Sequence, residues 1–341
     1  MSRILIALGT ILALLVLSET ALRQSQRQAR EEASALRLLG PLPIAEVSQI
    51  EIGAGTRTWR YVLRDSTWRY PAYHQAFVLD QRIDHILTSL LQTPTTFVSA
   101  EPGDLPHYGL GPGSPRLILF DAQSRPLLSV IQGRGAPGPR AGESYVQRVG
   151  ADTIFHLHAH PIHALDARDP PMLDRRVLPK ALPRKALQQI TFAGDSDYPL
   201  LSLRRQFEEI ALPTSGMPPL GPTYEWIGVF TDGEKTCVAP SVYAYTDYLK
   251  RLTWTALHDP AQTDAFASPR LLYLEYEDGI IDTLALGDAN QNGHYLRLHT
   301  TNHTLTITPE KADLLFPITS ALLDTLPYPT PYTQVEPFSP F

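Results

Sequence analysis

Two short stretches of the chain alternate between apolar and polar residues, the pattern of a strand with one buried face. These stretches are Val47–Ile52 and Leu187–Phe192. A longer stretch follows each of them: Ser114–Gly133 aligns with Ser268–Gly287 without a gap, and both begin Ser-Pro-Arg-Leu and end in Gly. Because the similarity covers several consecutive segments, the pattern predicts two tandem copies of one unit.

Each copy also carries one helical pattern. In residues 79–92 of the first copy, the apolar positions recur at helical spacing and form one face: Ile83, Ile86, Leu87, Leu90 and Leu91. The second copy has a corresponding face: Tyr245, Tyr248, Leu249 and Leu252. Since two or three strands precede the helix and about four follow it, we predict an α+β fold, in which an antiparallel sheet carries a separate helix.

The repeat alignment and the composition of the remaining segments give the predicted domain boundaries. The two copies are expected over residues 44–168 and 187–325, with a basic, proline-bearing linker over residues 169–186. Residues 23–43 are rich in strong helix formers and are predicted to form a helical stalk. Residues 326–341 form a proline-rich tail, in which the prolines are too close together for a helix.

The segment Ile4–Leu17 is apolar and uncharged. Fourteen helical residues are shorter than the hydrocarbon core of a bilayer, but an extension to Leu22 supplies enough length to cross it. We therefore predict a transmembrane anchor over residues 1–22. A cleaved signal peptide is the competing interpretation, because its apolar core is also short.

Charge and cysteine content narrow the classes of partner and site. The chain has 29 Lys and Arg against 35 Asp and Glu, a net charge of -6, which gives no electrostatic reason to expect nucleic acid as a partner. One cysteine, Cys237, excludes an internal disulfide and a cysteine-based zinc site. Its apolar neighbours favour a small core residue over a nucleophile.

A histidine-rich stretch is the strongest candidate for chemistry. On a strand, His156, His158 and His160 would share one face, where imidazoles can hold zinc or copper. The repeat argues against this interpretation, because these positions align with ordinary polar residues of the second copy: Thr306, Thr308 and Glu310. We therefore predict an exposed polar face and no metal site.

Two further groups of residues are candidates for a site. Asp166, Asp169 and Asp174 lie among Arg168, Arg175 and Arg176, and interleaved charges of this kind favour a salt-bridged loop over a catalytic acid pair.

The second group is a candidate partner or ligand loop: His107, Tyr108, Gly109 and Leu110. In the alternative interpretation, Tyr108 and Leu110 fill the core while Gly109 turns the chain. No catalytic motif or cofactor-binding motif stands out, so we predict no catalytic residues and no cofactor.

Several of these residues resemble an uncharacterised family of membrane-anchored repeat proteins, a domain of unknown function encoded beside gliding-motility-type ABC transporters. The resemblance covers most of residues 44–195 and, more faintly, the second copy. It is carried by short elements along the chain: Val47, Ile50, Ile52, Trp68, Pro71, Tyr108–Leu110, Tyr145–Val146 and Leu173–Leu178. Pro71 follows Trp68 one residue earlier than in the family, and the second copy lacks the Tyr-Gly-Leu element.

The resemblance implies a non-catalytic accessory subunit in the inner membrane, with its C-terminal domain extracytoplasmic, working with an ABC transporter permease and ATPase or with other envelope proteins. The arginines after Leu22 would by themselves place that domain in the cytoplasm. Two alternatives stay open. One is an envelope glycan- or peptide-binding module that uses Tyr70, Tyr73 and Trp254, and the other is a metal-dependent envelope hydrolase built on the histidine strand.

Overall fold

The computed structural model describes residue 19 and residues 44–137, 142–194, 197–208, 223–259, 264–317 and 319–323. The predicted stalk and tail lie outside these residues, as does the predicted anchor except for Glu19. In the part of the chain that the structure describes, no helix combines the length and the apolar character needed to span a bilayer. The described residues divide into two compact units, one containing residues 44–72 and 78–173 and the other containing residues 73–77 and 174 onward.

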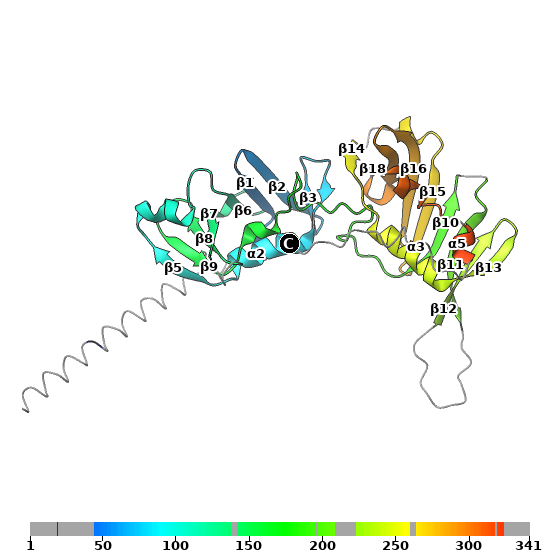
Figure 1. Cartoon of the computed structure of the whole chain (residues 1–341), viewed down its shortest axis with the longest axis horizontal. Coiled ribbons are helices and arrows are strands. Elements are labelled where there is room, and N and C mark those ends of the chain that lie inside the picture. Colours follow the sequence, from blue (N-terminus) through cyan, green and yellow to red (C-terminus); the bar gives the residue numbers. More distant parts are fainter. Residues whose placement is uncertain are drawn as a thin grey trace, which may run out of the picture. The chain divides into compact units, whose positions relative to one another are not determined.

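The first nine strands form one antiparallel sheet (Figure 1). In chain order the elements of this half are η1 (Ile44–Glu46), β1 (Gln49–Ala54), β2 (Arg57–Arg64), β3 (Thr67–Tyr70), β4 (Ala76–Phe77), α2 (Asp80–Leu91), β5 (Thr95–Ser99), η2 (Pro102–Tyr108), β6 (Arg116–Phe120), β7 (Pro126–Gly135), β8 (Ser144–Arg148), β9 (Ile154–Leu157) and η4 (Pro161–Ala164). The strands lie side by side in the order β4-β3-β2-β1-β6-β7-β8-β9-β5.

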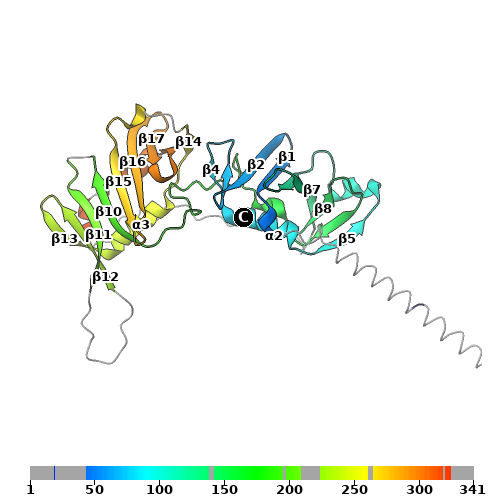
Figure 2. The same cartoon turned by 180° about the vertical axis from the view of Figure 1, so that it is seen from behind.

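The second nine strands form a sheet of their own, which Figure 2 shows from behind. The elements are β10 (Leu187–Ala193), β11 (Leu200–Glu208), β12 (Thr223–Phe230), β13 (Gly233–Cys237), α3 (Ala239–Arg251), β14 (Ala256–His258), η5 (Asp264–Phe266), β15 (Arg270–Tyr276), β16 (Ile281–Asn290), β17 (Gly293–Leu298), η6 (His299–Thr301), β18 (His303–Ile307), α4 (Pro309–Asp313) and α5 (Thr319–Leu323). Their order is β13-β12-β11-β10-β15-β16-β17-β18-β14.

The two sheets have the same topology when their elements are matched in chain order. In both, the strand that follows the helix pairs at the far edge with the last strand, β5 with β9 and β14 with β18. The prediction of two antiparallel units with few helices is confirmed. Each unit has four strands before its helix and five after it, which is more than the sequence predicted. β4 in the first unit and β14 in the second have only two and three residues, too few to show alternation.

The core of the first unit lies between its sheet and α2. Ile50 and Ile52 of β1 are fully buried, as the alternating pattern predicted. From the helix, Ile83, Ile86 and Leu90 are buried at spacings of three and four residues. Truncating a side chain of this kind to Ala costs about 2–5 kcal/mol of folding free energy.

The second unit repeats this arrangement with aromatic residues on its helix. Tyr245 is fully buried and donates a hydrogen bond to the backbone oxygen of Leu315 at 2.7 Å. Cys237, at the end of β13, is buried with its thiol free, which confirms its prediction as a core residue. Burial raises the pKa of this thiol above its ordinary value, because a thiolate is poorly solvated there.

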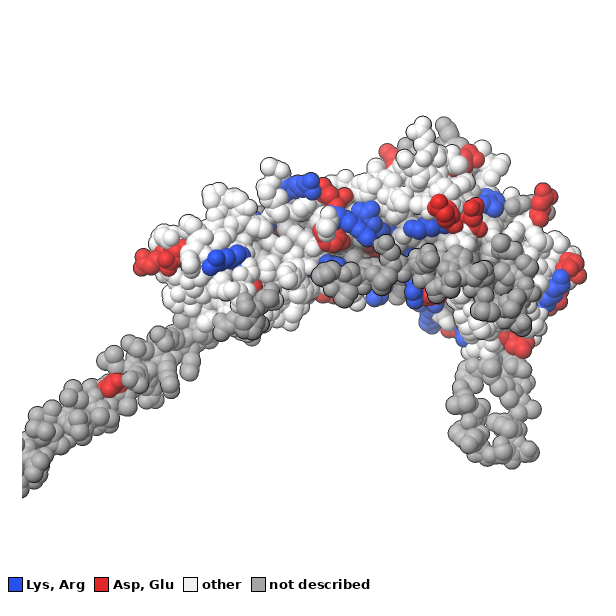
Figure 3. Space-filling view, in the orientation of Figure 1, with Lys and Arg blue, Asp and Glu red and all other residues white. Residues whose placement is uncertain are grey.

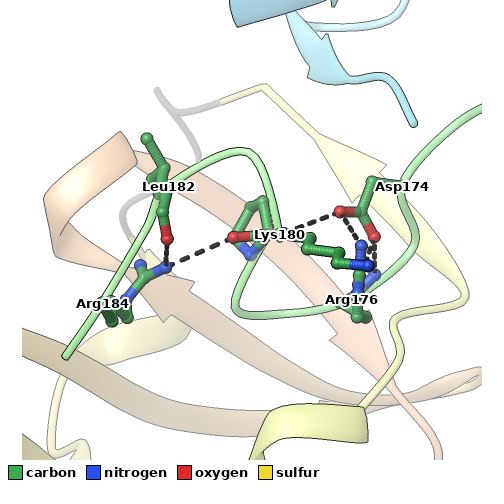
Figure 4. A network of polar contacts seen from close by, with 6 residues as sticks. Asp174, Arg176, Lys180, Leu182 and Arg184 are labelled. Atoms are coloured by element: carbon green, nitrogen blue, oxygen red, sulfur yellow. Dashed lines mark hydrogen bonds and ion pairs between the residues drawn. The ribbon is translucent and has the colours of Figure 1, made fainter. Parts of the chain in front are cut away.

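The stretch predicted as a linker is folded, and from Asp174 onward it belongs to the second unit. Figure 4 shows its network of polar contacts. The buried carboxylate of Asp174 accepts hydrogen bonds from the Arg176 guanidinium at 2.8 and 2.6 Å and from the Lys180 backbone N–H at 2.9 Å. Arg184 donates to the backbone oxygen of Leu182 at 2.8 Å and pairs with the fully buried Asp282 of β16. The Asp174 contacts order the stretch itself, and the Arg184–Asp282 pair joins it to the second sheet.

Candidate functional site

The ladder between β8 and β9 brings together two histidines and a carboxylate. Tyr145 lies opposite His156, and Ser144 lies opposite Leu157. Because side chains two residues apart point to the same face of a strand, Glu143 projects beside His158 and near His156. We call these three residues, Glu143, His156 and His158, the His–Glu cluster.

Each oxygen of the Glu143 carboxylate contacts a different imidazole. Oε2 of Glu143 lies 2.8 Å from Nε2 of His156, and Oε1 lies 3.2 Å from Nδ1 of His158. The three ligand-type atoms all lie within 4.8 Å of one another. This spacing and these donor types suit a divalent transition-metal ion as well as a simple ion pair.

The prediction of an exposed polar face is wrong at His156, which is only 5% exposed. Its counterpart Thr306 is fully buried as well, so the repeat argument misjudged both positions. In the first unit, the η2 segment contributes to this burial through a row of aromatic rings. Tyr108 packs on Tyr145 with ring centroids 4.6 Å apart, and Tyr145 packs on His156 at 5.4 Å. Part of the sheet's second face is therefore covered.

The candidate ligand loop is the end of this η2 segment. Leu110 is buried and Gly109 adopts φ +70°, as the packed-connection alternative predicted. Tyr108 is half-buried and takes part in the aromatic row that leads to the cluster. His107 is exposed and lies edge-on to Tyr108 at 5.1 Å. The candidate ligand loop and the His–Glu cluster are thus connected through the ring of Tyr145, a contact that the sequence did not indicate.

A close backbone approach holds the loop against β7. A Cβ at Gly133 would lie 2.2 Å from the backbone oxygen of Tyr108. The second unit uses the same device, because a Cβ at Gly287 would lie 2.2 Å from the backbone oxygen of Ala265 in η5. An open groove of about 520 Å³ adjoins the loop, lined mainly by glycines and prolines together with Ser114, Gln132 and Arg134.

His160 is not part of the His–Glu cluster. Its Nδ1 lies 3.0 Å from Nε2 of Gln132, and its ring packs against His163 with centroids 4.1 Å apart. Burial lowers the pKa of His160 below its ordinary value, and positive charge on His163 and His85 lowers it further. The strand pattern predicted three histidines on one face, but β9 ends at Leu157 and the chain turns before His160.

The second unit has no equivalent of the cluster at these positions. The β17–β18 register places Tyr295 opposite Thr306, as Tyr145 lies opposite His156. Gly293 therefore stands where Glu143 does, and Thr308 where His158 does. A Cβ at Gly293 would lie 2.0 Å from the backbone oxygen of Ile307, so this position does not accommodate a carboxylate side chain.

The acidic candidates are structural. Asp174 is paired with Arg176 as described, which confirms the salt-bridged loop there. Asp169 pairs with Arg57 at 3.1 Å and accepts a hydrogen bond from the Trp59 indole at 3.0 Å. Asp166 accepts a hydrogen bond from the backbone N–H of Arg168.

The aromatic residues of the glycan-binding alternative are packed. Tyr70 and Trp254 are buried, and the half-buried Tyr73 accepts a hydrogen bond at its hydroxyl from the Leu257 backbone N–H at 3.1 Å. They do not form an exposed stacking surface of the kind that sugars use.

Glu143 is the site residue that sequence reasoning missed. Its position two residues before Tyr145 was a usable signal, because it places the carboxylate on the face shared by His156 and His158 once β8 and β9 are paired. No protein-family model, curated protein or solved structure matches this chain.

Proposed function

We propose that this protein is a non-catalytic interaction subunit that is anchored in the inner membrane by residues 1–22 and carries both sheet units on the extracytoplasmic side. Its partners would be the permease and ATPase of a gliding-motility-type ABC transporter. The observation that carries the proposal is the repetition of one nine-stranded sheet in the same strand order. Two copies of one sheet present two similar sets of strand edges to protein partners.

One edge of the first sheet is suited to binding a protein partner. β5 is the outermost strand, and an outermost strand presents backbone groups that a partner's strand can pair with. It has no charged residue, and its Phe97 is 46% exposed. By contrast, the edge strand β13 carries exposed Glu234 and Lys235, and charges of this kind discourage pairing.

Surface charge gives a second line of support. On the face shown in Figure 3, acidic and basic side chains of the described residues are interspersed. A surface of mixed sign suits protein association better than binding to a polyanion.

The first experiment is a pull-down of the full chain from native membranes in detergent, together with a topology reporter fused after Phe341. We expect reporter activity outside the cytoplasm and co-purification of a permease and an ATPase. Phe97→Asp should reduce their recovery at least about tenfold. Ile281→Asp is the matched control, because Ile281 is also exposed but lies on an interior strand. Recovery of no transporter component would remove the proposal's support.

The His–Glu cluster favours a second candidate, a metal-dependent envelope hydrolase, because hydrolytic zinc sites use three protein ligands of these types. Glu143→Gln separates the two candidates. A hydrolase would lose a metal-dependent hydrolysis of cell-wall material, whereas an interaction subunit would recover its partners as before.

A further inference from the structure

We propose that Glu143, His156 and His158 bind one divalent transition-metal ion, of which Zn²⁺ is the best match. This inference concerns the first unit alone and stands whether or not the chain works with a transporter. It starts from the convergence of three side chains, from two neighbouring strands, on a single point.

The donor set fits the ion. Zn²⁺ accepts imidazole nitrogen and carboxylate oxygen at about 2.0–2.2 Å in a tetrahedral arrangement, which separates neighbouring ligand atoms by roughly 3.3 Å. The two nitrogen–oxygen separations in the cluster are 2.8 and 3.2 Å. Because all three ligand atoms already lie within 4.8 Å, small side-chain rotations bring them to that geometry.

The surroundings orient the histidines. Oγ1 of Thr96, on the neighbouring strand β5, lies 3.1 Å from Nε2 of His158. If that nitrogen carries the proton and donates to Thr96, Nδ1 is left with a lone pair toward Glu143. This is the outer-shell arrangement that metal-binding histidines use. His156 is held by burial and by the ring of Tyr145.

The cluster is also accessible. The side chain of His158 is 38% exposed and that of Glu143 is 23% exposed, while His156 lies at the base. An ion can therefore enter from solvent, and three protein ligands leave a coordination position for water or for a group on a partner.

An ordinary His–Glu ion pair is the competing explanation, and the two make different predictions. If the cluster is only an ion pair, it binds no metal, and Thr96→Val leaves the protein's metal affinity unchanged. A metal site binds one equivalent, depends on all three side chains and is sensitive to the outer-shell threonine.

The test is a competition titration of Zn²⁺ against a fluorescent chelator, using the full chain purified in detergent without a histidine tag. Co²⁺ substitution provides a second readout, because tetrahedral Co²⁺ has strong visible absorption bands. We expect one equivalent per chain. Glu143→Gln, His156→Gln and His158→Gln should each weaken binding at least about 100-fold, and Thr96→Val about 10-fold or more.

Controls separate the site from other histidines and from unfolding. His160→Gln and His258→Gln should bind as the wild type does. His258 is a suitable control because its Nε2 lies 2.6 Å from Oγ1 of Thr306, the counterpart of His156 in the second unit. Near-UV circular dichroism shows whether each variant is folded. The inference is overturned if the wild type binds no stoichiometric Zn²⁺, if folded Glu143→Gln retains full affinity, or if a control variant loses binding.

Discussion

The surroundings of His160 oppose protonation of its imidazole. Its folded-state pKa lies below the ordinary value of about 6.5, first because the ring is partly buried and then because of His163 and His85. A histidine with a lowered pKa contributes stability above its unfolded pKa, and this contribution is lost as the pH falls toward the folded pKa.

We therefore expect the free energy of unfolding to fall from about pH 7 to about pH 5, and His160→Gln to reduce that fall. Urea denaturation at several pH values measures this free energy of unfolding. His299→Gln, at an exposed position, should retain the wild-type pH dependence. Burial also lowers the pKa of His258, so part of the acid sensitivity should persist in His160→Gln. Equal pH dependence in His160→Gln and wild type would contradict this assignment.

At the scale of elements, the contact between η2 and β7 requires a glycine at position 133, because there is no room for a side chain there. A methyl group at Gly133 would meet the Tyr108 backbone oxygen at 2.2 Å, so the segment must move away from the strand. Gly133→Ala should destabilise the first unit by about 1–3 kcal/mol and expose Tyr145, as measured by thermal unfolding and tyrosine fluorescence. Gly142→Ala, with no atom near its Cβ, is the control. Equal stability of the two variants would show that η2 does not need the close approach.

The stretch that begins at Asp174 is ordered by the buried Asp174–Arg176 ion pair within it, and this makes another prediction. Asp174→Ala should cost about 3 kcal/mol, because it removes four hydrogen bonds from a carboxylate that is 2% exposed. Asp232→Ala breaks an exposed pair with Lys235 and should leave the unfolding midpoint nearly unchanged. If both variants unfold at the wild-type midpoint, the network does not hold the stretch.

For the whole molecule, two units of equal topology and unequal side chains should respond differently to metal. A ligand that binds only the native state stabilises it by about 2.7 kcal/mol at 100 times its Kd. Zn²⁺ should therefore raise the midpoint temperature of the first unit's calorimetric transition, which is the transition that Gly133→Ala lowers. It should leave the midpoint of the second unit's transition, which Asp174→Ala lowers, unchanged. A Zn²⁺ shift confined to the second unit's transition would contradict a site at the His–Glu cluster.

Much of the fold followed from the sequence alone. Alternation identified β1 and β10, helical spacing identified α2 and α3, and the ungapped alignment of Ser114–Gly133 with Ser268–Gly287 gave the duplication. These signals are local, because burial of one face imposes the periodicity on the sequence itself.

Tertiary structure decided the rest. The aromatic row over His156 includes Tyr108 of η2, a segment nearly fifty residues earlier whose return to the sheet leaves no periodic pattern. The partnership of Glu143 with the histidines depends on the register between β8 and β9. The attachment of the predicted linker to the second sheet depends on Arg184 meeting Asp282, 98 residues later. The sequence thus determined which segments are strands and helices, since periodicity is a property of neighbours. Only the folded chain determined which side chains meet, because that depends on pairing between distant segments.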